Sequence, residues 1–117
     1  LSYKSNEQTY RDVGIALQQL NFRVAEHPDF GGSSDVHAAN SYHNYGEAFD
    51  VTHHIGDYAS SIAKTEALKN KIRELNLFAE VIGPGDGDPN HETHLHLGGL
   101  MRPITEEDIK ALNSLGI

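Results

Sequence analysis

Two short segments of this chain show the alternation of a strand with one apolar and one polar face. In residues 47–53, apolar side chains alternate with a set that includes Asp50, and in residues 93–98 they alternate with His94 and His96. Successive side chains of a strand point to opposite faces of its sheet. Converging polar groups are costly to bury unless they bind something. The chain must therefore place the apolar faces in a core and leave the polar faces for a ligand.

Helices are predicted to alternate with these strands. Apolar residues recur at helical spacing in residues 5–20 and 58–76. A third helix is expected to begin at Thr105, where Asp108 resembles the acidic member of a capping box, and to end near Gly116. Two further short strands are expected at residues 21–25 and 78–82. The predicted fold class is α+β, with one small, mostly antiparallel sheet flanked by helices.

Length and charge restrict the kinds of protein this chain can be. Its 117 residues are enough for one core but not two, so residues 1–117 are predicted to form a single domain, expected as a monomer. A net charge of −8, with only nine scattered Lys and Arg, disfavours binding to nucleic acid or anionic membranes. No stretch approaches the roughly 20 apolar residues that span a bilayer, so membrane insertion is not expected. A start at Leu1 suggests an excised or processed domain.

Any metal site in this chain must be built from imidazoles and carboxylates, because there is no cysteine. His43 ends a long polar loop, and Asp50 lies on the following strand; the two can converge if the chain turns at Gly46, which tolerates unusual backbone angles. In an extended second cluster, one face would carry Glu92, His94 and His96. A zinc ion with two imidazoles, one carboxylate and an open water position would satisfy such groups and would suit catalysis.

The two clusters together resemble a known family. The pattern Ser41-x-His43-x-x-Gly46-x-Ala48-x-Asp50, followed by His94-x-His96, is similar to that of the zinc D-alanyl-D-alanine carboxypeptidases and related peptidoglycan endopeptidases. The same residues resemble the amino-terminal signalling domain of hedgehog proteins, which shares that fold. The match covers roughly residues 3–99. The resemblance implies a hedgehog-like fold and, for the peptidases, cleavage of peptidoglycan peptides outside the cytoplasm.

The resemblance also implies roles for individual residues. The zinc ligands would be His43, Asp50 and His96. Ser41 would help to hold a substrate carboxylate, and His94 would stabilise the oxyanion formed at the scissile carbonyl. Zinc would acidify its bound water, and a carboxylate base would carry the proton to the leaving amine.

The general base is where this chain departs from the family. Carboxypeptidases place an acid three residues before the last ligand, where this chain has Thr93, and hedgehog domains place it six before, where this chain has Asn90. Glu92 lies between these positions and would face the metal if the strand extended that far, so Glu92 is the predicted base. Asp86 and Asp88, on the glycine-rich loop, are the alternatives.

The remaining predictions concern substrate binding and the other histidines. In many family members an Arg binds the substrate carboxylate, and Arg23 is its one plausible substitute in this chain. His37 precedes His43 by six residues, a spacing also found in hedgehog domains, so it is expected either to line the substrate groove or to be an exposed loop residue. His27 is expected to be a structural loop residue, and His53 a hydrogen-bonded or surface residue paired with His54. The rival to the peptidase interpretation is a non-catalytic, hedgehog-like zinc domain that binds a protein or a glycan.

Overall fold

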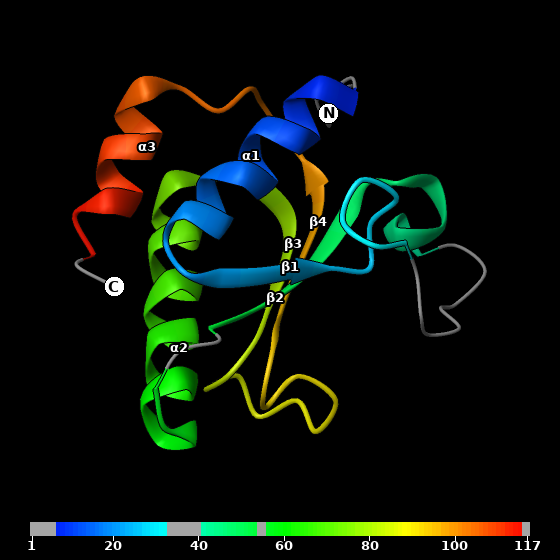
Figure 1. Ribbon diagram of the computed structural model, residues 1–117. Coiled ribbons are helices and arrows are strands. Elements are labelled where there is room, and N and C mark those ends of the chain that lie inside the picture. Colours follow the sequence, from blue (N-terminus) through cyan, green and yellow to red (C-terminus); the bar gives the residue numbers. More distant parts are fainter. Residues whose placement is uncertain (1–6, 33–40, 54–55, 116–117) are drawn as a thin grey trace.

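The computed structural model describes residues 7–32, 41–53 and 56–115. In chain order, the described part contains α1 (Glu7–Gln19), β1 (Phe22–Ala25), the short 3-10 helix η1 (Tyr42–Tyr45), β2 (Ala48–His53), α2 (Tyr58–Leu75), β3 (Phe78–Ile82), β4 (Leu95–Leu100) and α3 (Glu106–Asn113) (Figure 1). The predicted α+β class and all seven predicted helices and strands are confirmed. No helix among the described residues has the length and apolar character needed to cross a membrane.

The four strands form one antiparallel sheet in the order β1-β2-β4-β3. β2 and β4 are therefore the central strands, although more than 40 residues separate them in the chain. Their register sets Asp50 directly opposite His96, and the register of β1 sets Ala25 opposite Asp50. The two polar clusters of the sequence meet at the centre of the sheet for this reason.

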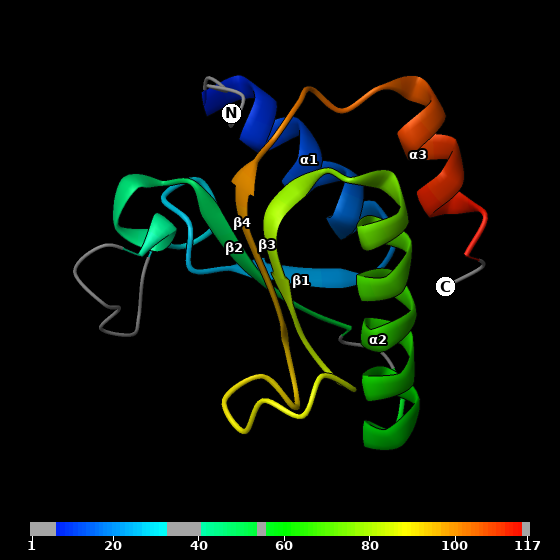
Figure 2. The same cartoon turned by 180° about the vertical axis from the view of Figure 1, so that it is seen from behind.

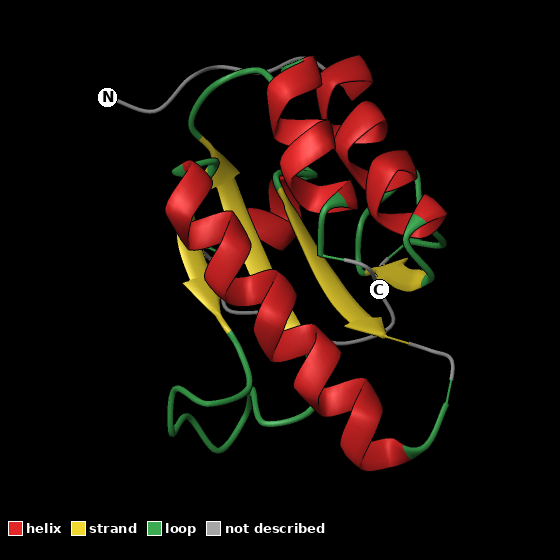
Figure 3. Ribbon diagram, turned by 90° about the vertical axis from the view of Figure 1, so that its left-hand side faces the viewer, coloured by secondary structure: helices red, strands yellow, loops and turns green. Residues whose placement is uncertain are grey.

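The three α-helices lie on one side of the sheet, and η1 lies on the other (Figures 1 and 2). Seen from the helix side, α2 lies in front of the strands (Figure 3). Its amino terminus is capped by the Asp57 side chain, which accepts a hydrogen bond from the Ser60 N–H, and its carboxyl end is Asn76 in the left-handed conformation. The face that α1 and α2 cover holds the apolar core, which includes Val13, Leu17, Phe49, Val51, Leu68, Ile72, Leu95 and Leu97.

Several boundaries and one burial differ from the predictions. β4 begins at Leu95, two residues later than expected, because residues 91–94 form bends that connect the preceding loop to the strand. The capping box of α3 is present as predicted, with Thr105 and Asp108 each accepting the other's backbone N–H. His53 is buried at 3% exposure on the core face, where its ring packs edge-on against Phe22, so it is not a surface residue. His54 lies outside the described residues.

Candidate metal centre

η1 presents His43 to the open face of the sheet. The Ser41 hydroxyl accepts the His43 N–H at 3.3 Å and so begins the turn, and Gly46 ends it in the left-handed conformation at φ 68°. The predicted turn at Gly46 is therefore present. His27 holds the same turn through a second hydrogen bond. Its Nδ1 accepts the Asp29 N–H, so the ring proton is on Nε2, and this Nε2–H donates to the Gly46 carbonyl at 2.8 Å. This buried histidine is structural, as expected.

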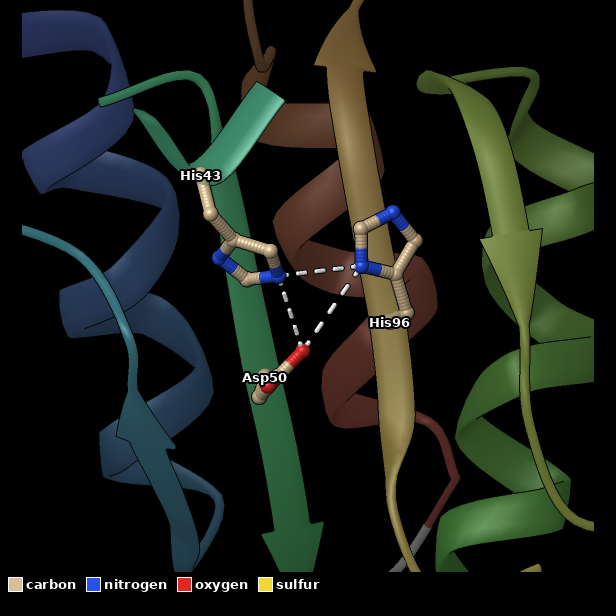
Figure 4. A group of neighbouring side chains, drawn as sticks. All are labelled: His43, Asp50 and His96. Atoms are coloured by element: carbon tan, nitrogen blue, oxygen red, sulfur yellow. Dashed lines mark hydrogen bonds and ion pairs between the residues drawn. The ribbon is translucent and has the colours of Figure 1, made fainter. Parts of the chain in front are cut away.

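His43, Asp50 and His96 converge on one point above β2 and β4, with the helices behind the sheet (Figure 4). The His43 Nε2 atom lies 3.1 Å from His96 Nδ1 and 3.1 Å from Asp50 Oδ1, and His96 Nδ1 lies 3.6 Å from Asp50 Oδ1. Ligands bound tetrahedrally to a zinc ion at 2.0–2.1 Å lie about 3.3 Å apart. The separations match those of three ligands around one small metal ion.

Outer hydrogen bonds turn the free lone pair of each imidazole towards this point. His43 Nδ1 lies 2.8 Å from the Glu26 carbonyl oxygen, and His96 Nε2 lies 2.9 Å from Glu80 Oε1. A carbonyl and a carboxylate only accept, so both outer nitrogens carry the proton. In the neutral rings the inner nitrogens are then unprotonated. Three acceptors therefore face one another at the centre of the group, an arrangement that requires a shared cation.

The pKa values of His43 and Asp50 reflect the close approach of these acceptors. Burial disfavours a charged His43, but its hydrogen bonds with Asp50 and the Glu26 carbonyl outweigh burial and raise the pKa of His43 above the ordinary 6.5. Burial likewise disfavours ionised Asp50, yet its interactions with His43 and His96 hold its pKa well below the ordinary 3.8. Without a metal ion, a proton shared by His43 and Asp50 is the cation that this geometry favours.

A cleft of about 330 Å³ opens beside His43, Asp50 and His96, the candidate metal-binding group. Its walls come from β1, β2, the bend before β4 and the first residue of α2, and they include Arg23, Glu26, Asp50, Tyr58 and His94. The structure therefore brings the predicted substrate residue Arg23 and the predicted oxyanion residue His94 to one cleft with Asp50, a candidate metal ligand. Arg23 lies opposite Thr52, two residue pairs along the β1–β2 ladder from Asp50.

A second cavity, of about 300 Å³, adjoins the cleft. The two share Thr52, Tyr58 and Thr93 in their walls, and the second continues to Ser61 and Ile62 on α2. Tyr58 stands between them with 70% of its surface exposed. The cleft and the second cavity thus lie side by side between Asp50 and the start of α2.

Among the described residues, the predicted site residues Glu92, Ser41 and Asp86 do not line this cleft. Glu92 is exposed and lies in the bends before β4, so strand alternation does not aim it at the metal. The Ser41 hydroxyl is engaged as the cap of η1. His37 lies outside the described residues. Asp86 is held by Arg73 and Lys69, and hydrogen bonds from Arg73 keep its pKa well below the usual range. It therefore forms part of the loop's anchor on α2.

Two residues near the metal-binding group were given no role from the sequence. Glu80, on β3, accepts the outer proton of His96; the only signal was a charged residue within the short strand 78–82. His91 has its ring centroid 5.0 Å from that of His94 and 5.9 Å from that of His96, and its Nδ1 lies 3.2 Å from Asp88. Its signal was the spacing His91-x-x-His94-x-His96.

Neither a protein-family model, nor a curated protein, nor a solved structure shows significant similarity to this chain. The class of site is therefore defined by the residues and their geometry. It is a candidate metal centre of two imidazoles and one carboxylate on the open face of a four-stranded antiparallel sheet.

Proposed function

We propose that this protein is a zinc-dependent peptidase that hydrolyses peptidoglycan stem peptides, as a D,D-carboxypeptidase or an endopeptidase. The observation that carries the proposal is the convergence of His43, Asp50 and His96 beside an open cleft. Three protein ligands with a fourth position left for water are typical of catalytic zinc sites, whereas structural zinc sites use four. The sequence resemblance to D-alanyl-D-alanine carboxypeptidases and hedgehog domains supports the same ligand set and a hedgehog-like fold.

The ligand set favours zinc over calcium or magnesium. Hard cations take six or more oxygen ligands, whereas this group offers two buried imidazole nitrogens and one carboxylate oxygen. Zinc bound here would supply an acidified water and would polarise a peptide carbonyl. Because peptidoglycan lies outside the cytoplasm, an extracytoplasmic location is part of the proposal.

The residues in and near the cleft would perform the remaining tasks, which are binding of the substrate carboxylate, stabilisation of the oxyanion and proton transfer. Arg23 is the cationic side chain of the cleft wall and would hold a substrate carboxylate. His94 would hydrogen-bond the oxyanion. Glu92 remains the predicted base, and a rotation of its exposed side chain would be needed to reach the cleft. His91 lies beside Asp88 and its ring contacts that of His94. It would be a second residue near the metal-binding group that can carry a proton.

One observation favours the rival, a non-catalytic zinc domain that binds a protein or glycan. The exposed position of Glu92 and the engagement of Asp86 by Arg73 leave neither carboxylate directed at the metal-binding group. Binding would then use the same groove without cleavage. The zinc ligands would be the same in both cases, so metal content does not separate the two functions.

Product analysis separates them. The zinc-loaded protein is incubated with purified peptidoglycan and with defined stem peptides, and the products are identified by mass spectrometry. The proposal predicts cleavage at one type of peptide bond, abolished in Asp50→Ala. Stoichiometric zinc with no cleavage of any tested peptide would contradict the peptidase and favour the binding domain.

A further inference from the structure

We infer that Glu80 is a positioning residue for the metal ligand His96, and that Gly98 is required because it leaves the space through which Glu80 reaches that ring. The inference rests on the proposed metal-binding role of His96. Glu80 Oε1 lies 2.9 Å from His96 Nε2. Glu80 comes from β3, whereas the three proposed ligands come from η1, β2 and β4. β3, the neighbour of β4, thus supplies a residue that contacts a proposed ligand and not the metal itself.

Glu80 decides which nitrogen of His96 faces the metal. A neutral imidazole carries its proton on either nitrogen, and only the unprotonated one can bind a metal ion. The Glu80 carboxylate holds the proton on Nε2, so the lone pair of Nδ1 faces Asp50 and His43. It also fixes the rotation of a ring that is 8% exposed. Loss of such an outer partner usually weakens metal binding by about 10–100-fold.

Gly98 lies directly opposite Glu80 in the β3–β4 register and two residues after His96. A Cβ atom at position 98 would lie 2.9 Å from Glu80 Oε1, 2.9 Å from His96 Nε2 and 3.0 Å from Tyr42 Cδ2. Atoms at these separations must move apart. Any side chain at position 98 would therefore enter the contact between the carboxylate and the imidazole, and would also press on the Tyr42 ring.

The test compares Glu80→Ala and Glu80→Gln with the wild type by competition for zinc against a chelator of known affinity. Glu80→Ala should weaken zinc binding by about 10–100-fold. Glu80→Gln should weaken it less, because an amide oxygen can still accept the His96 proton. Glu107→Ala is the matched control: it removes the same charge from a side chain that is 85% exposed on α3, and zinc affinity should not change.

A second readout needs no metal. In the zinc-free protein, long-range nitrogen–proton NMR spectra at a pH where His96 is neutral should show its proton on Nε2, and Glu80→Ala should give a mixture of the two tautomers. Gly98→Ala should resemble Glu80→Ala in both measurements. Zinc affinity within twofold of the wild type, or an unchanged His96 tautomer, in Glu80→Ala would overturn the inference. Failure of the wild type to bind zinc would refute the proposed function, while the tautomer measurement would still decide the role of Glu80.

Discussion

Each histidine of the metal-binding group is held in place by a hydrogen bond from its outer nitrogen, and its inner nitrogen faces the centre of the group. His43 donates to the carbonyl of Glu26, and His96 donates to the carboxylate of Glu80. The Glu26 carbonyl can take this position because Glu26 adopts a left-handed backbone conformation at φ 60°. Side-chain identity at the ligand positions is therefore only part of the site, since the tautomer of each ring is fixed by a group outside it.

At the same scale, His94 is expected to act on the substrate and not on the metal. It lines the cleft, but it lies outside the group of three converging ligands. His94→Ala should retain one zinc per chain and lower turnover by about two to three orders of magnitude, the usual loss for one oxyanion donor. Elemental analysis and peptide hydrolysis are the two measurements. Loss of zinc from this variant would make His94 a ligand.

The family resemblance predicts that His43, Asp50 and His96 converge, which the structure confirms, but the sequence did not predict the surroundings of these residues. His43, Asp50 and His96 belong to short local patterns, so their convergence could be predicted. The contacts of Glu80 and His91 depend on strand register and on the path of a loop, which no local pattern encodes. The prediction that Glu92 faces the metal-binding group extends the alternation of β4 three residues beyond its start at Leu95. Strand ends are set by the loop that precedes them, in this case by the bends at residues 91–94.

Among the secondary-structure elements, η1 is the one on which the site depends most. It is a single short turn, and it carries a ligand between a serine cap and a left-handed glycine. Both ends are tied to the segment after β1, through the Glu26 carbonyl at His43 and through His27 at Gly46. The predicted strands and helices account for the sheet and for the helices that cover it. The hydrogen bonds between these two loops join residues 17 to 19 positions apart, and no periodicity in the sequence indicates them.

Gly46→Ala tests the dependence on η1. A side chain in the left-handed conformation costs about 1 kcal/mol, and relaxation of this strain would move His43. Zinc affinity should fall together with the free energy of unfolding. Gly87→Ala is the control, because Gly87 has a similar φ of 80°, and a Cβ there would meet nothing within 4 Å. It should lose similar stability and keep the zinc affinity. Equal zinc affinities in the two variants would show that η1 does not hold His43 in place.

For the whole molecule, the site should make stability depend on pH in opposite ways with and without metal. The raised pKa of His43 stabilises the zinc-free fold below pH 6.5, and this contribution is lost as pH rises through the folded-state pKa. The lowered pKa of Asp50 stabilises the fold above pH 3.8. The zinc-free protein should therefore gain most from this pair between these values. Zinc competes with the proton on His43, so its stabilisation should grow as pH rises.

Urea unfolding at about pH 5 and about pH 8, with and without zinc, measures both trends. Asp50→Asn is the control, because it keeps the shape of the side chain but removes the charge that raises the pKa of His43. The stability difference between the zinc-free wild type and this variant should shrink from pH 5 to pH 8. A difference that grows with pH would mean that His43 and Asp50 do not share a proton in the fold.

X-ray absorption at the zinc edge tests the central claim, that one zinc ion is held by His43, Asp50 and His96, most directly. The protein loaded with one zinc per chain should show four nitrogen or oxygen ligands at about 2.0–2.1 Å, with the scattering pattern of two imidazoles. His43→Ala and His96→Ala should each lose one imidazole or lose the metal. A wild-type spectrum of six oxygen ligands, or an unchanged two-imidazole spectrum in both variants, would contradict the site.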